Sequence, residues 1–339
     1  MRLWANVIAA PQWYLEGLSY YGHAGYTRGR KWWTDAEMLQ QRDLRGKHYI
    51  VTGANSGIGF AIAEELAKRH ATVHMICRSA ERAEAARAQL METARAAGVA
   101  EPDLRVHLAD MGSMSSVRAF AAKFTQDHDV VHALINNAGS LFLEETRTDD
   151  GVDMAMAIAI GGSFLLTGLM LPLLKKAGDG RVVNVSSGGQ YLVSLDPSDL
   201  KLSQYTGASF DGAASYSYSK KLQVQLTRRW ATHPAAQGVV FHCMHPGWTV
   251  TPGVEKSLKS FMDRHNAMMR TPAQGADTAV WLAIATEPAQ KNGLFWLDRE
   301  EIRTDMRLAG DGVLVRRSRR AVDAVRAHQW LRHAGRVGR

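Results

Sequence analysis

The sequence predicts an α/β protein built on one doubly wound, parallel β-sheet. Short β-branched or apolar runs alternate with longer helical stretches, as in consecutive β–α–β units. Runs such as VVNV and VVFHCM are almost continuously apolar, which is typical of strands covered on both faces. A glycine-rich turn joins the first of these strands to a helix-forming stretch, a connection that is common at the start of such sheets.

Seven strands are expected in chain order. They are His48–Thr52, Thr72–Cys77, Arg105–Leu108, His132–Ile135, Arg181–Val185, Val239–Met244 and Leu294–Leu297. The helical stretches between them include Glu81–Ala97 and Ser116–Thr125. Ser113 has the residue type and the position of an N-cap for the second of these helices.

Composition and charge exclude several classes of protein. The chain has 339 residues, 46% of them hydrophobic and 22% charged, which is ordinary for a globular protein with one large domain. The net charge is +8, but the stretch from Glu301 to Arg339 holds ten arginines against four acidic residues, a net charge of +6. Because the rest of the chain is nearly neutral, we expect no nucleic acid partner.

The cysteines and the apolar runs bear on where the protein works. Cys77 and Cys243 are the two cysteines of the chain, so a disulfide framework is excluded and a reducing, cytoplasmic compartment is expected. We count no apolar run of the about 20 residues that a membrane-spanning helix needs. The sequence therefore predicts no such helix.

The glycine-rich turn, TGANSGIG, follows the first expected strand and precedes the helix-forming FAIAEELAKRH. Glycine is needed where φ is positive and where a phosphate must approach the backbone closely. The new helix then offers its free N–H groups and the positive end of its dipole to a pyrophosphate. A tight turn without a ligand is the alternative, but the strand before it and the helix after it favour a nicotinamide dinucleotide site. The residues expected to line that site are Gly53, Asn55, Ser56, Gly57, Ile58 and Gly59.

The residue at the end of the second strand indicates which dinucleotide binds. A carboxylate there would hold the ribose hydroxyls of NAD. This chain has Arg78 instead, with Arg82 one helical turn further on. An arginine can pair with a 2′-phosphate, which a carboxylate would repel. NADP(H) is therefore the expected cofactor, and a solvated arginine is the alternative.

Two further strand ends are expected to face the dinucleotide. Asp110 follows the third strand, where its carboxylate accepts a hydrogen bond from the adenine amino group or, alternatively, caps the next helix. Asn137 lies in NNAG after the fourth strand, where small polar residues suit a backbone that a cofactor approaches. A simple asparagine–glycine type of turn has the same composition.

Tyr216 and Lys220 lie four residues apart in YSYSK, ahead of a helical stretch, so their side chains share one helix face. A lysine ammonium about 4 Å away contributes about 4 kcal/mol at an effective dielectric constant of about 20, enough to bring the pKa of a tyrosine from about 10 to about 7. The pair would pass a proton to or from a carbonyl oxygen while the nicotinamide carries hydride. A surface pair is the alternative. Tyr218 has Leu222 four residues on and lacks such a partner.

Ser186 and Ser187 end the strand RVVNV. A hydroxyl at the carboxyl end of a strand can hold a substrate oxygen, and a strand-to-loop cap is the alternative. His242 and His245 raise the question of a metal. Neither has a carboxylate or cysteine at ligand spacing, so no metal is expected there.

Five motifs occur in order between about Leu44 and Asp298: TGANSGIG, NNAG, VNVSS, YSYSK and HPGWTVT. With them the chain resembles the short-chain dehydrogenase/reductase family. The resemblance implies a single Rossmann-type domain and an oxidoreductase that interconverts a carbonyl and an alcohol. It also implies that Ser187 polarises the carbonyl, that Tyr216 is the acid/base, and that Lys220 lowers the pKa of Tyr216 and holds the nicotinamide ribose.

The same resemblance extends to the nicotinamide and substrate side. Pro246, Gly247, Thr249 and Thr251 would flank the nicotinamide. Segments such as ICRS, VSSGG, SFDG and AQGADTAVWLA resemble a branch of the family that is similar to its retinol-dehydrogenase-like members, which implies a small lipophilic carbonyl or alcohol as substrate. The loop 188–215 would form a wall for that molecule or merely bury its own side chains. Its apolar residues are Tyr191, Leu192, Val193, Leu202, Tyr205 and Phe210.

One departure from the family pattern concerns the proton relay. The helix before MLPLL usually carries an asparagine that binds a relay water, and the aligned position here is Ala159. We therefore expect a slower or differently wired enzyme. The alternative is a cofactor-binding Rossmann protein with weak or no catalysis that acts as a sensor or partner-binding module.

Three segments are expected: an aromatic N-terminal segment over 1–45, an NADP-binding domain over 46–300 and a basic tail over 301–339. The first segment contains eight of the chain's 27 aromatic residues, too many for a flexible linker. Either it caps the core while the tail is solvated, or the two ends attach the chain to an anionic membrane surface. A homo-oligomer is compatible with the sequence, which does not decide it.

Overall fold

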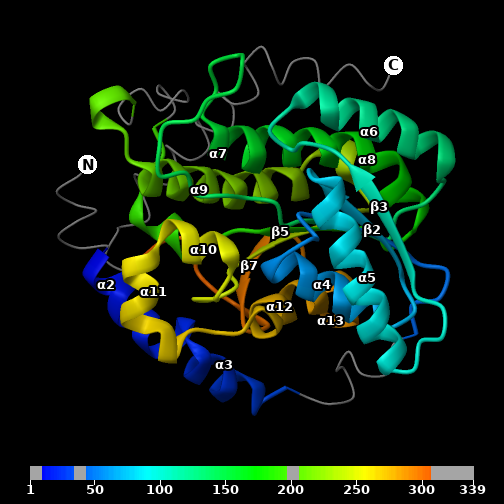
Figure 1. Ribbon diagram of the computed structural model, residues 1–339, viewed down its shortest axis with the longest axis horizontal. Coiled ribbons are helices and arrows are strands. Elements are labelled where there is room, and N and C mark those ends of the chain that lie inside the picture. Colours follow the sequence, from blue (N-terminus) through cyan, green and yellow to red (C-terminus); the bar gives the residue numbers. More distant parts are fainter. Residues whose placement is uncertain (1–9, 34–42, 197–205, 307–339) are drawn as a thin grey trace.

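The computed structural model describes residues 10–33, 43–196 and 206–306. A central sheet lies between two layers of helices (Figure 1). The strands follow the order β3-β2-β1-β4-β5-β6-β7-β8, and all pairs are parallel except β7–β8. The predicted doubly wound α/β fold is thus confirmed.

All seven predicted strands are present, with ends that differ by at most two residues. The strands are β1 His48–Thr52, β2 Thr72–Cys77, β3 Asp103–Leu108, β4 Ala133–Asn136, β5 Arg181–Val185, β6 Val240–Met244, β7 Leu294–Leu297 and β8 Glu300–Glu301. The sequence analysis missed β8. It forms a hairpin with β7 through Asp298 and Arg299, which have positive φ angles of 51° and 62°. Tight hairpin turns of this kind usually contain glycine, and this one does not.

The helices include the two that were predicted. They are α2 Ala10–Glu16, α3 His23–Arg30, α4 Gly57–Ala67, α5 Ala80–Ala96, α6 Met114–Asp127, α7 Met154–Met156, α8 Ser163–Lys176, α9 Gly212–Ala231, α10 Pro252–Ser257, α11 Lys259–His265, α12 Pro272–Ile284 and α13 Thr286–Ala289. The Ser113 hydroxyl accepts a hydrogen bond from the Ser116 N–H, so Ser113 is the N-cap of α6 as expected.

Consecutive strand residues are buried on opposite faces of the sheet. Ile50, Leu134 and Val182 pack with α6 and α8 on one face. Their neighbours Val51 and Ile135 pack with α4, α5 and α12 on the other. Burial on both sides explains why these strands are continuously apolar rather than alternating.

The helical segment Met154–Lys176 corrects one expectation from the sequence. Its 23 residues are long and apolar enough to cross a membrane, with a mean hydropathy of 2.0 in the most apolar window, although the sequence analysis counted no such run. The small residues Gly161, Gly162 and Ser163 interrupt the apolar pattern without adding charge. Because 78% of that window is buried inside the fold, the segment serves as a core helix of the domain.

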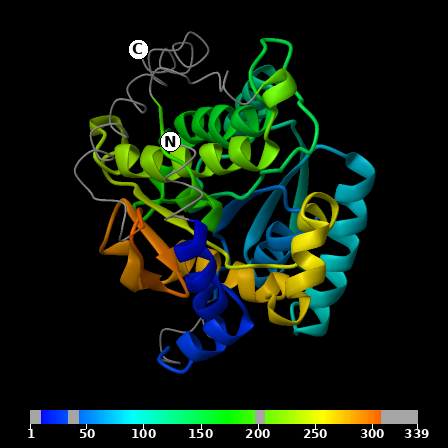
Figure 2. The same ribbon diagram turned by 90° about the vertical axis from the view of Figure 1, so that its left-hand side faces the viewer.

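The N-terminal helices pack beside the β7–β8 edge of the sheet (Figure 2). Arg270 is 1% exposed and forms a bidentate ion pair with Asp298, while its guanidinium also donates to the carbonyl oxygens of Tyr20 and Gly22. Trp13 packs against Trp248 with ring centres 5.6 Å apart and the ring planes tilted by 57°. The segment 10–33 is thus fixed to the sheet domain, which accounts for part of its aromatic content.

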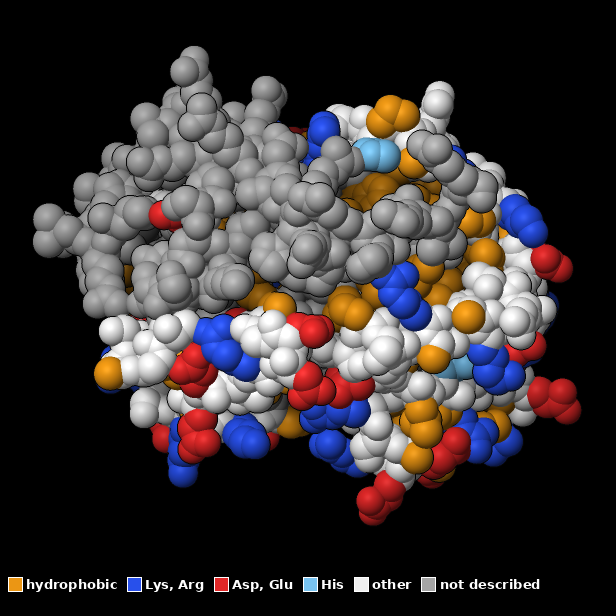
Figure 3. Space-filling model, turned by 90° about the horizontal axis from the view of Figure 1, so that it is seen from above, with side chains coloured by type: hydrophobic (Ala, Val, Ile, Leu, Met, Phe, Trp, Pro, Cys, Tyr) orange, Lys and Arg blue, Asp and Glu red, His pale blue; other side chains and the backbone are white. Residues whose placement is uncertain are grey.

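Charged side chains of both signs are interspersed on the face seen in Figure 3. Surface ion pairs include Lys123–Asp127 at 3.1 Å and Lys176–Asp129 at 3.2 Å. This mixture agrees with the nearly neutral body inferred from composition. The predicted basic tail lies outside the described residues from position 307 onwards.

Candidate active site

The glycine turn between β1 and α4 has the shape that a dinucleotide site requires. Gly53 and Gly57 have φ angles of +66° and +54°, a region that side chains disfavour. A Cβ atom on Gly59 would lie 2.3 Å from the Gly53 carbonyl oxygen, so no larger residue fits there. Ser56 is the N-cap residue of α4, and its hydroxyl accepts no hydrogen bond from the first N–H groups of that helix. These groups fit a pyrophosphate at the helix N-terminus.

Asn137 braces this turn from the end of β4. Its amide donates to the carbonyl oxygens of Thr52 and Gly53, at 2.9 and 3.4 Å. The Thr52 hydroxyl in turn accepts the N–H groups of Asn137 and Ala138. The side chain of Asn137 therefore holds the glycine turn in shape, a role that the sequence analysis did not distinguish from direct cofactor contact.

The predicted adenosine end lies beside the glycine turn. Arg78 is exposed directly after β2, and Arg82 lies one turn into α5. Among the described residues, no hydrogen bond or ion pair engages the Arg78 guanidinium, so it is available to a 2′-phosphate. Asp110 accepts a hydrogen bond from the Gly112 N–H at 2.9 Å, so one of its carboxylate oxygens already shapes the turn before α6.

The loop after β6 reaches the glycine turn through one of its predicted residues. A Cβ atom on Gly57 would lie 3.2 Å from the Thr251 side chain, which also caps α10. Thr249 is buried and donates to the Pro246 carbonyl at 3.0 Å. Gly247 instead faces the N-terminal segment, because a Cβ atom there would lie 2.3 Å from Arg270. Of these four residues, Thr251 lies nearest to the expected pyrophosphate.

The three predicted catalytic side chains come together at the carboxyl end of the sheet. Ser187 follows β5, and its hydroxyl forms a hydrogen bond with Tyr216 on α9. The Lys220 Nζ lies 5.5 Å from the centre of the Tyr216 ring. It is also close to NNAG, since a Cβ atom on Gly139 would lie 3.0 Å from it. Three distant segments thus form one group beside the glycine turn.

The expected effect of Lys220 on Tyr216 is wrong for this arrangement. Burial raises the pKa of Tyr216 to about 12, and the hydrogen bond with Ser187 lowers it only in part. Lys220 is 2% exposed, and its ammonium donates to the Val185 carbonyl at 2.8 Å rather than to the tyrosine. Burial lowers the pKa of Lys220 to about 8. Near neutral pH both groups are therefore mainly protonated.

Gln223 is a residue that sequence reasoning missed. Its Oε1 accepts a hydrogen bond from the Lys220 ammonium at 3.1 Å, and its Nε2 donates to the Ala159 carbonyl at 3.0 Å. Ala159 lies in a π-helical turn, Ala157–Gly162, between α7 and α8. Position 159 has no side-chain amide, but the amide of Gln223 reaches its backbone from α9, the helix that also carries Lys220. Its position three residues after Lys220, on the same helix face, was the signal available in the sequence.

Two apolar residues of the loop after Ser187 pack inside the fold. Tyr191 is buried with Val224 and Phe295, and Val193 is buried with Tyr218. For these two residues, the alternative that they bury their own loop is correct. Leu202 and Tyr205 lie outside the described residues.

His242 and His245 do not form a metal site. His242 shares hydrogen bonds with the Pro288 carbonyl and the Trp296 indole, at 2.9 and 3.1 Å. His245 accepts the N–H groups of Gly188 and Gly247 through Nδ1, and burial lowers its pKa to about 3. It therefore fixes the start of the Ser187 loop relative to β6, which spacing alone did not indicate.

Comparison with known proteins supports this arrangement. A family model described as short chain dehydrogenase matches residues 47–193. The chain is 40% identical to dehydrogenase/reductase SDR family member 12 of Bos taurus, an alignment that covers 88% of this chain and 90% of the relative. It is 38% identical to the Homo sapiens protein of the same name, over 91% and 92% of the two chains. Retinol dehydrogenase 14 of Mus musculus is 35% identical, over 76% and 79%.

Solved structures agree on the fold. A short chain dehydrogenase/reductase family protein superposes with a TM-score of 0.56 at 26% identity, over 75% of this chain and 96% of the other. A Mycobacterium paratuberculosis protein reaches 0.63 at 24% identity, over 89% and 97%. The predicted resemblance to the family is confirmed, and the branch that the segments ICRS, VSSGG, SFDG and AQGADTAVWLA indicated is that of the two member 12 relatives. The chain belongs to the short-chain dehydrogenase/reductase family and is an oxidoreductase that acts on CH–OH and carbonyl groups with a nicotinamide dinucleotide.

Proposed function

We propose that this protein is an NADP(H)-dependent oxidoreductase that interconverts a lipophilic carbonyl and its alcohol, with Tyr216 as the acid/base. The observation that carries the proposal is the group formed by Ser187, Tyr216 and Lys220 next to the glycine turn. The dinucleotide, when bound, supplies or accepts the hydride. The chain's own residues hold the substrate oxygen and move the proton.

In the reductive direction, the Ser187 and Tyr216 hydroxyls donate hydrogen bonds to the substrate carbonyl oxygen. Tyr216 then gives its proton to that oxygen as the carbonyl carbon is reduced, so an alcohol forms. The high pKa of Tyr216, about 12, keeps it protonated and ready to donate. The Ser187 hydroxyl, whose hydrogen bond lowers the pKa of Tyr216, stabilises the tyrosinate that remains.

Gln223 completes the proton path in the place of the missing asparagine. It holds the Lys220 ammonium against the Val185 carbonyl and anchors the π-helical turn at Ala159. A proton lost from Tyr216 is returned through Lys220, whose lowered pKa of about 8 makes it a good donor near neutral pH. Ala159 therefore changes the wiring of the relay without removing its buried amide.

The preference for NADP(H) is supported by Arg78 and Arg82 at the adenosine end. Both are exposed, and the residue that directly follows β2 is Arg78 rather than an acidic residue. The lipophilic substrate class is supported by relatives that are named retinol dehydrogenases. Purified protein should therefore reduce medium-chain and polyene aldehydes with NADPH.

The decisive experiment compares Tyr216→Phe with the wild type in NADPH-dependent reduction of a panel of such aldehydes. We expect turnover to fall at least about 1,000-fold, because the proton donor is lost, while NADPH still binds. Tyr218→Phe is the matched control: its hydroxyl bonds to the Asp196 backbone, away from Ser187, so turnover should persist. Turnover that survives in Tyr216→Phe refutes the acid/base assignment. Binding of NADPH by the wild type without turnover on any aldehyde supports the sensor alternative.

Cofactor preference is tested separately with Arg78→Asp. Fluorescence titration of the wild type should give tighter binding of NADPH than of NADH. In the variant the carboxylate should weaken NADPH binding about 10- to 100-fold and leave NADH binding little changed. Equal affinities of the wild type for the two cofactors would refute the NADP(H) proposal.

Contact with a membrane surface through the N-terminal segment is part of this proposal. Leu15, Tyr20 and Trp32 are 65%, 54% and 80% exposed, and the last turn of α3 carries the basic residues Arg28 and Arg30. Exposed apolar and basic residues in one segment suit an anionic lipid surface. This placement would give the enzyme access to a membrane-dissolved substrate.

Co-sedimentation with phosphatidylserine vesicles tests the contact. The wild type should pellet with the vesicles, and a triple variant Leu15→Ser, Tyr20→Ser, Trp32→Ser should not. Leu143→Ser removes an exposed leucine that lies elsewhere and serves as the control. If all three proteins pellet equally, the N-terminal segment is not the attachment site.

A further inference from the structure

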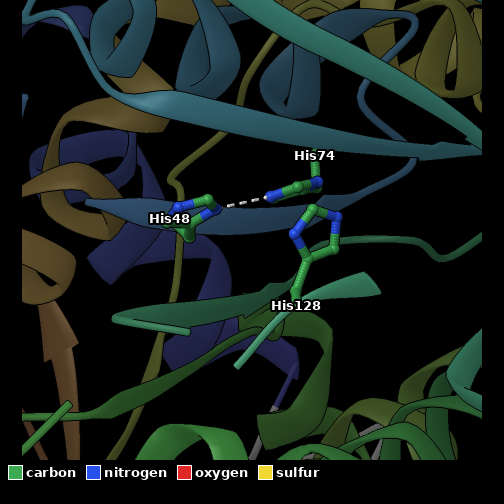
Figure 4. Close-up of side chains that lie close together, drawn as sticks. All are labelled: His48, His74 and His128. Atoms are coloured by element: carbon green, nitrogen blue, oxygen red, sulfur yellow. Dashed lines mark hydrogen bonds between the residues drawn. The ribbon is translucent and has the colours of Figure 1, made fainter. Parts of the chain in front are cut away.

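A cluster of imidazoles lies at the amino end of the sheet, away from the glycine turn. His48 begins β1, His74 lies within β2, and His128 follows α6 (Figure 4). One ring nitrogen of each lies within 4.8 Å of the others. Nothing in the proposed chemistry uses these residues, which stand where this face of the sheet otherwise carries isoleucine and phenylalanine.

Register explains why the three side chains converge. Ile50 pairs with His74 across β1 and β2, so His48, two residues before Ile50, points to the same face and lies diagonally from His74. The last turn of α6 crosses this face, since Phe124 packs on His74 with ring centres 4.8 Å apart. His128 is the residue that follows α6, and its ring lies 4.7 Å from that of His74.

A fourth histidine, His107, contacts the cluster and would fix the orientation of the His74 ring. The His48 Nδ1 and the His74 Nε2 lie 3.0 Å apart, and the His74 Nδ1 lies 2.9 Å from the His107 Nε2. If the His74 Nε2 binds an ion, its Nδ1 carries the proton and donates it to His107. Metal-binding histidines typically use their second nitrogen in this way.

From this geometry we propose that His48, His74 and His128 bind one divalent cation of the zinc class, with water as the fourth ligand. Zinc–nitrogen distances of about 2.0–2.1 Å place the nitrogens of a tetrahedral site about 3.3 Å apart. The His48–His74 pair is already near that separation. His128 is half-buried at a helix end, so a rotation of its side chain closes the third distance.

The electrostatic surroundings permit a cation. Burial lowers the pKa of His74 to about 2 and that of His107 to about 4, and the pKa of His48 and His128 is lowered as well, so the rings are neutral at pH 7. Arg105, whose charge acts on all three histidines, is neutralised by a bidentate ion pair with Asp103. Binding then needs a change of tautomer at His48 and no net loss of protons.

Such an ion would join β1, β2 and the end of α6, and so act as a structural staple. The reacting groups lie at the opposite, carboxyl end of the strands, so the site does not depend on the proposed function. We expect zinc to stabilise the protein without changing its turnover.

The test uses zinc chloride alone on the full chain, followed by gel filtration and metal analysis. The wild type should retain one more equivalent of zinc than His128→Gln or His48→Gln. His233→Gln, which removes a half-buried histidine outside the cluster, is the control and should retain as much as the wild type. His74 is left unchanged because it is completely buried and its loss would disturb folding.

Two further readouts separate this site from adventitious binding. Cobalt should give the visible d–d bands of a tetrahedral site in the wild type and not in His128→Gln. Zinc should raise the Tm of the wild type by several degrees and leave that of His128→Gln unchanged. The proposal is overturned if the wild type retains no more zinc than His128→Gln, or if His233→Gln loses the same equivalent.

Discussion

Two groups of polar side chains, each partly or fully buried, lie at opposite ends of the same sheet. At the carboxyl end, Tyr216 is bonded to Ser187, and Lys220 is held by the Val185 carbonyl and by Gln223. At the amino end, His48 and His74 bond to other imidazoles. Both contain side chains whose pKa burial has shifted.

The difference between the two ends follows from the direction of parallel strands. Loops that leave the carboxyl ends diverge, so side chains there can face a ligand between them. The amino-end group lies on the strands themselves, beneath α6, where side chains meet one another at fixed register. On the two proposals above, chemistry on a substrate takes place at the first end, and the second contributes to stability.

The largest effect is expected at the glycine turn. Gly59→Ala should abolish dinucleotide binding and destabilise the fold by about 2–4 kcal/mol, since the added Cβ meets the Gly53 carbonyl at 2.3 Å. Gly168→Ala on α8, where nothing lies within 4 Å of the added Cβ, should instead stabilise by about 0.5–1 kcal/mol. Urea denaturation and NADPH titration measure both. A Gly59→Ala protein that binds NADPH normally would show that the turn is not the site.

Gln223→Leu should have the next largest effect, and it should lower kcat without changing the affinity for NADPH. Without its Oε1, Lys220 keeps the Val185 carbonyl but loses the link to Ala159, so kcat should fall about 10- to 100-fold, as for a lost acid/base contact. NADPH affinity should change little. Gln225→Leu, two residues further along the same helix, is the control.

An added amide at position 159 sharpens this prediction. Ala159→Asn in the Gln223→Leu background should restore part of kcat, because the side chain then supplies the missing polar group. If Gln223→Leu leaves kcat and its pH profile unchanged, Gln223 has only a packing role.

Acid should destabilise the fold in part through the buried imidazoles at the amino end of the sheet. The pKa of His107 is about 4 in the folded protein and about 6.5 when unfolded, so the unfolded state binds more protons between these values. Stability is therefore full above pH 6.5 and falls as the pH drops towards 4, by about 1–2 kcal/mol near pH 5. His107→Gln should flatten this dependence in urea titrations at pH 7 and pH 5. An equal slope in both proteins would assign the acid sensitivity to other groups.

The sequence predicted the fold and most of the site because short segments carry the signals. The glycine turn, the pair Tyr216–Lys220 and the two-sided strands each depend on local composition. Two errors arose where partners are far apart: the pKa of Tyr216 depends on burial, and the ammonium of Lys220 is directed to Val185, 35 residues away in sequence. The hairpin strand β8 was missed because its turn lacks glycine.

The sequence by itself determined the parallel sheet and the glycine turn and proposed the reacting side chains, since period, glycine position and four-residue spacing are properties of neighbouring residues. Only the tertiary structure decided what those side chains contact. It brings Gln223 to Ala159 across 64 residues, and His74 to His128 across α5, β3 and α6. Such contacts arise from strand register and helix packing, which no single segment of the chain contains.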